Sequence, residues 1–382
     1  SPKPSGQDAN TGIRKLVIKL TKTTSASITV FFTPILTGEE GSKSLPTYGI
    51  TNTYKLLKQY DPATTLEPNS EGIYEISTPD QLCLLSELVA QGDSFSGKTL
   101  CLTEDIDMKG RSLLPIGGNG SGISFSGTFD GQGHVIQNLL IFEPASEQVG
   151  LFGKASKAVI RNLGIDDGLV TGGKATGSLI GVGSNVTVEN CFARCNVICV
   201  GSFGGGLVGQ LGATSTLKNA YHNGYVKTAV NVAGGLVGYV SSSTTTTVEN
   251  CYHVGKLTDS LGRCGLLGFY NTKDQSLLPK SITVDNCYST TLLKCEEMVT
   301  LEGVESYTNS AQVTKEQLMH KAVTLGTAFM DDCEQKNSGY PVFSWQCKTL
   351  LPADLALSTE AELRLLAYRV NSGKDTFSGK TI

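Results

Sequence analysis

The chain has 382 residues, 39% of them hydrophobic, so it is long enough to bury a sizeable core and is not expected to be disordered. Its formal net charge is only −4, and it has no lysine or arginine cluster of the kind that follows a phosphate backbone, so nucleic acid is excluded as a partner. Charged residues make up 17% and glycine occurs 44 times, a balance typical of a β-rich protein with many tight turns. No apolar run approaches the roughly 20 residues that span a bilayer, so we expect no membrane span.

Residues 1–70 differ in sequence character from the rest of the chain. The stretches "LVIKL" at 16–20 and "SITVFF" at 27–32 are apolar and rich in β-branched residues, which is typical of strands. We therefore predict a small N-terminal β domain, or the remainder of one, over residues 1–70.

The next segment, residues 71–350, is predicted to form one repetitive module that opens with a helix. Thr78 can cap the helix, with Gln81 three positions on, and Leu82, Leu85 and Val89 then share one face. A strand predicted after the helix would complete a cover for the open end of a stack of coils.

Two short phrases recur through this module at steps of about 30 residues. The first is Gly-Leu-hydrophobic-Gly, which starts at Gly150, Gly206, Gly235 and Gly265, with a "SLIG" copy at Ser178. The second phrase ends in an asparagine, and the two phrases mark the following repeat residues: Gly150, Gly153, Gly206, Gly209, Gly235, Gly238, Gly265, Gly268, Asn138, Asn162, Asn190, Asn219, Asn250 and Asn286.

A unit of this length cannot bury its own apolar face, so the period predicts that neighbouring units stack. The predicted fold is all-β: a parallel β-helix, or solenoid, with short capping helices, in addition to the N-terminal β segment. We expect it to be right-handed, as parallel β crossovers are. Equivalent residues then lie above one another, which predicts an inward column of leucine and valine, glycines at corners that exclude a side chain or a negative φ, and an asparagine amide ladder at a turn.

Aromatic residues follow the asparagine phrase in successive repeats, at Phe192, Tyr221, Tyr252 and Tyr288. Each comes after a small or apolar residue assigned to the interior, so strand alternation favours an outward direction unless an end helix covers the column. An exposed column of rings would be a stacking platform for sugars or peptide side chains. We take these four residues as the candidate ligand-binding residues.

His222 and His253 occupy matching places in adjacent repeats. A stacked pair could bind a metal or respond to pH, but the repeat favours two solvent-facing rings without a special role. No residue pattern in the chain predicts a nucleophilic triad or a zinc protease motif.

Aspartates offer the alternative of an enzyme. Some β-helices cleave polysaccharides with carboxylates on one groove, and Asp105, Asp107, Asp130 and Asp166 are the candidates here. The same carboxylates could instead hold calcium, although no cofactor is required by the sequence. Turn and capping roles explain them more simply, so we expect no catalytic residue.

The end of the chain repeats the start of the module. Residues 351–382 contain "LSTEAELRLLAYRVNSGKDTFSGKTI", which matches the opening near residue 76 and indicates the beginning of a second module, or a C-terminal cap. A helix over 314–330 is also predicted, with a capping box from Thr314 to Gln317.

These phrases together resemble the GLUG-motif proteins, modular bacterial surface proteins named for the Gly-Leu-hydrophobic-Gly phrase. The resemblance rests on "GLFG", "GLVG" and "GLLG" in register with "ENC" phrases, on "FSGTFDGQGHVIQNL" and on the closing "GYPVFSWQ". It implies an extracellular module, secreted or attached to the cell surface, whose partners are host or bacterial surface glycans or proteins. We therefore expect a non-catalytic stalk that also presents an adhesive face, with a polysaccharide-active enzyme or a pure spacer as alternatives.

Overall fold

The computed structural model describes residues 26–32, 35–38, 41–44, 48–54 and 60–382, apart from residues 110, 119–121, 231–232, 242–243, 259–262, 269–279, 293–304, 354, 379 and 381–382. The chain divides into two compact units, Ser1–Pro62 and Ala63–Ile382. The division therefore falls slightly before the predicted end of the first domain at residue 70. Residues 351–382 belong to the same compact unit as the solenoid.

The described residues of the N-terminal unit form two antiparallel strand pairs. Strand β1 (Ala26–Phe32) pairs with β4 (Tyr48–Tyr54), and β2 (Ile35–Gly38) pairs with β3 (Gly41–Ser44). The predicted strand at 27–32 lies within β1, whereas the one predicted at 16–20 lies outside the described residues. A β segment is thus present here, as expected.

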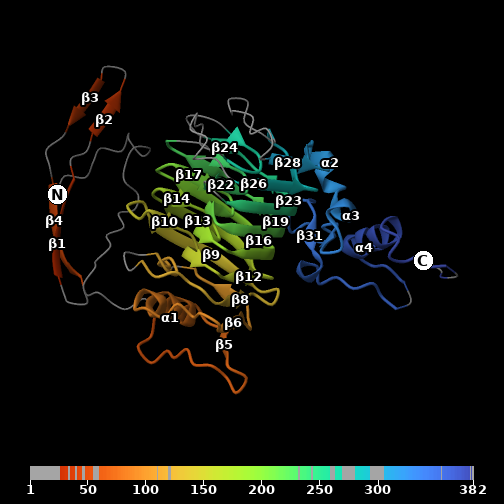
Figure 1. The fold of residues 1–382 in the computed structure, drawn as a ribbon, viewed down its shortest axis with the longest axis horizontal. Helices are drawn as coiled ribbons and strands as arrows, with labels where there is room; N and C mark the ends of the chain where they lie inside the picture. Colours follow the sequence, from red (N-terminus) through yellow and green to blue (C-terminus); the bar gives the residue numbers. More distant parts are fainter. Residues whose placement is uncertain are drawn as a thin grey trace. The chain divides into compact units, whose positions relative to one another are not determined.

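The second unit is built around a long parallel sheet in which each strand pairs with its counterpart from the next repeat (Figure 1). In spatial order its main strands are β5 (Ile73–Ile76), β6 (Thr99–Leu102), β8 (Thr128–Asp130), β12 (Val159–Arg161), β16 (Thr187–Cys199), β19 (Thr214–Asn223), β23 (Thr245–Val254), β26 (Ser281–Asp285) and β28 (Glu305–Thr308). Further strands continue the same sheet beyond a corner: β7 (Ile106–Asp107), β9 (Val135–Glu143), β13 (Gly164–Gly172), β20 (Val226–Thr228), β24 (Leu257–Thr258), β27 (Tyr288–Ser289) and β29 (Ala311–Gln312).

In the described part of the solenoid, two smaller parallel sheets complete the coils. One consists of β10 (Gln148–Val149), β14 (Ala175–Thr176), β17 (Phe203–Gly205), β21 (Ala233–Gly234) and β25 (Arg263–Cys264). The other consists of β11 (Phe152–Ser156), β15 (Ile180–Ser184), β18 (Val208–Gly212) and β22 (Val237–Val240). The protein is therefore a parallel β-solenoid, and the predicted fold class is confirmed. The leucines and valines of the glycine phrase, such as Leu207 and Val208, are buried.

The asparagine ladder is present at the corner after the main strands. Asn190 Nδ2 donates to Asn162 Oδ1 at 3.0 Å, Asn219 to Asn190 at 2.9 Å, Asn250 to Asn219 at 3.1 Å and Asn286 to Asn250 at 2.7 Å. All five have φ between 47° and 54°. Asparagine tolerates this left-handed conformation better than most residues, so it supplies both the turn and the ladder.

Asn138 does not belong to this ladder, which corrects the predicted series. Its strand, β9, pairs with β13 so that Leu139 lies beside Gly168, and the Asn138 side chain donates to Asp107 Oδ1 at 2.7 Å. The "VIQNL" phrase therefore matches the segment that follows Asn162, not the Asn162 phrase itself. Asn138 and Asn162 are 24 residues apart, a shorter spacing than between the later asparagines, and this spacing could have revealed the difference from the sequence.

The glycines of the repeated phrase are required because a side chain would not fit, and not because of their φ angles. The part of the prediction that invoked φ is therefore wrong. None of the described repeat glycines has φ in the left-handed region. A Cβ on Gly206 would instead lie 2.1 Å from the Gly235 carbonyl oxygen, and one on Gly235 would lie 2.0 Å from that of Gly265. At the variant copy, Ser178 is fully buried, and its hydroxyl donates to the Gly206 carbonyl at 2.5 Å.

Helix α1 (Pro79–Ala90) lies at the end of the stack where β5 and β6 are found (Figure 1). The Thr78 side chain accepts a hydrogen bond from the Gln81 amide, and the predicted apolar face of Leu82, Leu85 and Val89 is fully buried. The opening helix is thus confirmed in position and orientation.

The last part of the chain packs beside the solenoid. Residues 314–330, predicted as one helix, form α2 (Lys315–Met319), α3 (Ala322–Leu325) and strand β30 (Phe329–Met330), because the chain turns after His320 and again at Gly326, where φ is 101°. The Thr314 capping box is present. Strand β30 pairs antiparallel with β31 (Val342–Phe343), and the 3₁₀ turn η2 (Ser344–Gln346) and helix α4 (Glu360–Asn371) follow. We call residues 314–347 the closing segment.

Candidate functional site

The four candidate aromatic residues form a continuous column, and the column is buried. The rings of Phe192 and Tyr221 stack with centroids 5.1 Å apart, and those of Tyr221 and Tyr252 with centroids 4.8 Å apart. Tyr221 and Tyr252 are 0% exposed, Phe192 1% and Tyr288 3%. The sequence placed these residues in register, but the predicted exposed stacking platform is wrong.

The closing segment covers the column. Phe329 and Phe343 pack against Tyr221 at ring-centroid distances of 6.5 and 5.6 Å, and belong with the column to one apolar cluster. The Tyr221 hydroxyl donates to Gln346 Oε1 at 3.0 Å, and the Tyr252 hydroxyl donates to the Pro341 carbonyl. Burial raises the pKa of both phenols, so both stay neutral. The aromatic column is therefore an internal docking surface.

The histidine pair is also buried, contrary to the predicted solvent-facing position. His222 and His253 stack with ring centroids 5.3 Å apart, and both are 0% exposed. His222 Nε2 lies 3.0 Å from the Cys195 carbonyl, which can only accept, so this nitrogen carries a hydrogen. His222 Nδ1 is then the acceptor of the 3.2 Å contact with His253 Nδ1.

This tautomer assignment leaves His253 Nε2 as a buried acceptor without a partner among the described residues. Burial lowers the pKa of His222 to about 4, and burial together with the neighbouring His222 lowers the pKa of His253 well below its usual value. Both rings are therefore neutral near pH 7, and protonation of either would place a charge in the core.

The candidate aspartates are engaged by neighbouring side chains and backbone amides. Asp105 Oδ1 lies 3.2 Å from His134 Nδ1 and accepts from the Val135 amide, and Asp107 accepts from Asn138. Asp130 accepts hydrogen bonds from Arg161 Nε at 2.8 Å and from Asn162 Nδ2 at 3.0 Å, so it contacts the first asparagine of the ladder. Asp166 accepts a hydrogen bond from Arg194. These contacts join neighbouring coils, and those of Asp130 and Asp166 are ion pairs with Arg161 and Arg194, a role that differs from the turn and capping roles expected from the sequence.

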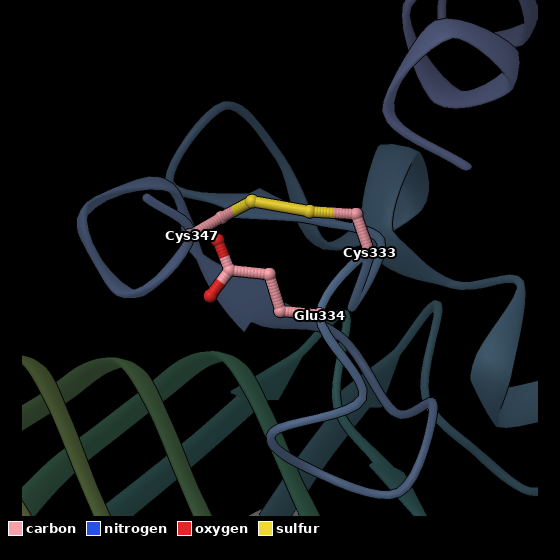
Figure 2. A group of neighbouring side chains, drawn as sticks. All are labelled: Cys333, Glu334 and Cys347. Atoms are coloured by element: carbon pink, nitrogen blue, oxygen red, sulfur yellow. A yellow bond between two sulfur atoms is a disulfide. The ribbon is translucent and has the colours of Figure 1, made fainter. Parts of the chain in front are cut away.

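Cys333, Glu334 and Cys347 form a group with the spacing of metal ligands, with atoms within 4.8 Å of one another (Figure 2). Cys333 and Cys347 form a disulfide, so neither sulfur is a thiolate. Burial alone would raise the pKa of Glu334, but hydrogen bonds from Lys336 and Thr349 outweigh it and lower the pKa to about 2. The group therefore ties the closing segment together. Among the described residues, the four candidate aspartates are not part of such a group.

The face of the long sheet that points away from the coil carries two columns that the sequence reasoning missed. One, the threonine column, follows the strand register through Thr128, Val159, Thr187, Thr216, Thr247 and Thr283. The other, the charge column, lies two residues further along each strand, at Asp130, Arg161, Glu189, Lys218, Glu249 and Asp285.

Members of both columns are half-buried or exposed, in contrast to the aromatic column. Arg161 pairs with Asp130 at 2.8 Å and Lys218 with Glu249 at 3.4 Å, so much of the charge is compensated along the column. The signal was available: a charged residue stands directly before each ladder asparagine from Asn162 to Asn286.

No family model matches the chain. Halomucin from Haloquadratum walsbyi is 28% identical over an alignment that covers 48% of this chain, and the chain spans only 2% of that protein's length. The crystal structure of a candidate immunoglobulin A1 protease from Bacteroides ovatus is similar with a TM-score of 0.50 and 18% sequence identity, over 73% of this chain and 94% of that one. This likeness supports the solenoid fold. No helix in the described part of the chain is long and apolar enough to cross a membrane.

Proposed function

We propose that this chain is a non-catalytic solenoid module of a surface-exposed or secreted protein, acting as a stalk and as an adhesive face for glycans or proteins. The observation that carries the proposal is the polar face of the long sheet. Its threonine and charge columns are accessible, whereas the aromatic column is used internally.

The continuity of the stack supports the stalk. Strands pair in parallel from β5 to β28, and the amide ladder links successive coils through side chains as well as backbone. Such a unit holds whatever precedes and follows it at a separation set by the number of coils. The sequence resemblance to GLUG-motif proteins and the similarity to a protein named Halomucin both favour a surface location.

The polar face suits hydroxyl-rich or charged partners. Threonine hydroxyls repeat at the strand spacing of about 4.8 Å, and each can donate and accept a hydrogen bond. The neighbouring charges alternate in sign from Asp130 to Glu249, which favours a partner with groups of both signs over a polyanion.

Catalysis is the alternative, because the structural neighbour is described as a protease and some solenoids act on polysaccharides. The hydrogen-bonded state of the four candidate aspartates weighs against it. Release of reducing ends from a polysaccharide, or cleavage of immunoglobulin A1, that is lost on a single Asp130→Asn or Asp166→Asn change would replace our proposal.

The test is binding of the labelled chain to an array of surface glycans and extracellular proteins. Reversal of the two positive charges of the charge column, by Arg161→Glu together with Lys218→Glu, is expected to lower the affinity for a bound partner at least tenfold. The control is Lys154→Glu, because Lys154 lies on β11 in a different sheet. If the folded chain binds nothing on the array, the alternative of a pure spacer is favoured.

A further inference from the structure

Two free cysteines lie side by side in the interior of adjacent coils. Tyr252 pairs with Tyr288 and His253 with Ser289 in the register of β23 and β27, so the residues just before them, Cys251 and Cys287, are also neighbours. The ladder bond from Asn286 to Asn250 fixes the same alignment on the other side. Both cysteines are fully buried, at 0% exposure.

The strand spacing is compatible with the Cα separation of a disulfide. Neighbouring strands lie about 4.8 Å apart, within the range of about 4.4–6.8 Å that Cα atoms of a disulfide adopt. Stacked residues on parallel strands point to the same side, so both Cβ atoms face the interior. The present contacts of the sulfurs are weak: Cys251 Sγ lies 3.1 Å from the Glu249 carbonyl, and Cys287 Sγ lies 3.2 Å from that of Asp285.

We propose that Cys251 and Cys287 form an inter-coil disulfide when the chain folds in an oxidising compartment. The disulfide between Cys333 and Cys347 supports this setting, because such bonds persist where thiols are not kept reduced. The inference does not rest on the adhesive function proposed above.

The reaction is thiol–disulfide exchange with a small or protein disulfide, such as oxidised glutathione. One cysteine, as its thiolate, attacks the oxidant and forms a mixed disulfide, releasing one oxidant thiol; the second thiolate then attacks the mixed disulfide and releases the other. The two cysteine protons end, by way of water, on the two released thiols, and two electrons pass to the oxidant, so two cysteines and one disulfide become one protein disulfide and two thiols. Burial raises the pKa of Cys251, which makes its thiolate scarce once the coil is closed, so the exchange occurs during folding.

The experiment is to refold the reduced, denatured chain in a mixture of oxidised and reduced glutathione, block free thiols with an alkylating reagent in denaturant, and map the proteolytic peptides without reduction. We expect a linked peptide pair containing Cys251 and Cys287, lighter than the sum of its parts by two hydrogen atoms and separated by reduction. The Cys333–Cys347 link in the same digest serves as the internal control for oxidation.

Cys191 is the matched control cysteine, since Ala220 separates it from Cys251 in the same column. Cys191→Ala is expected to leave the new link intact, and Cys287→Ala to leave Cys251 alkylated. Alkylation of both Cys251 and Cys287 in a sample where Cys333 and Cys347 are linked would overturn the proposal, as would a link from Cys251 to Cys191. If the chain is first folded in the reduced state and then given oxidised glutathione, we expect Cys251 and Cys287 to remain thiols. If the disulfide forms in this folded chain as fast as it does during refolding, the proposal that exchange occurs during folding is contradicted.

Discussion

Two neighbouring columns of the solenoid are buried for different reasons. Cys191, Ala220, Cys251 and Cys287 point into the coil and are covered by the coil itself. The aromatic column, one residue further along each strand, points the other way and is covered by the closing segment. Strand alternation therefore determines the direction of a side chain, but a distant part of the chain decides whether that side meets water.

The largest effect is expected from removing a ring of the aromatic column. Tyr252→Ala should lower the free energy of unfolding by about 3–5 kcal/mol, because a fully buried aromatic side chain is replaced by a cavity. Chemical denaturation measures this, with Tyr225→Ala, a half-buried tyrosine on the preceding coil, as the control. Equal losses for the two variants would mean that the closing segment does not cover the column.

The next effect tests the tight packing of the coil's own corners. Gly206→Ala should cost about 3 kcal/mol, at the upper end for overpacking, because its Cβ would meet a backbone oxygen at 2.1 Å. Gly212→Ala, whose Cβ would have no neighbour closer than 3.6 Å, should change stability by less than about 0.5 kcal/mol. Similar unfolding midpoints for the two variants would show that corner space is not the constraint.

The asparagine ladder, which stands one residue before the interior column on each strand, should contribute somewhat less to stability. Asn219→Ala places alanine at φ of 47° and removes two side-chain hydrogen bonds, so we expect a loss of roughly 2–3 kcal/mol. Asn219→Gly should recover the conformational part and lose only the hydrogen bonds. If glycine is no better than alanine in thermal unfolding, the left-handed turn is not what asparagine supplies.

Acid should weaken the interior through its histidines. The folded-state pKa of His222 is about 4, below its ordinary value of 6.5, so the unfolded chain binds a proton between these values and the folded chain does not. Stability therefore falls as pH falls through this window, by about 2 kcal/mol at pH 5 from His222 alone. Denaturation curves between pH 7 and 5 measure the slope, which should flatten when both His222 and His253 are replaced by glutamine.

Much of the fold was predictable because stacking repeats the same environment at a fixed period. The glycine phrases, the ladder from Asn162 to Asn286 and the capped helix at Thr78 all follow from local chemistry repeated in register. Asn138 was assigned to the ladder wrongly, because its phrase resembles the others but lies one strand later in the coil.

The candidate site was predicted less well, and the reason is physical. Only a long-range contact, such as that of Gln346 with Tyr221, shows that the aromatic column is covered. The histidines were misplaced because solvent was assumed for a polar ring, whereas His222 satisfies its nitrogens inside the coil. The charge column could have been found, since its spacing is that of the asparagines it precedes.

The most direct test of the account is nitration of tyrosines in the folded chain, read residue by residue by mass spectrometry. We predict that Tyr221 and Tyr252, which are fully buried, stay unmodified while the half-buried Tyr225 is nitrated. Nitration of Tyr252 as fast as Tyr225, in a sample shown to be folded, would contradict the internal aromatic column and restore it as a surface for ligands.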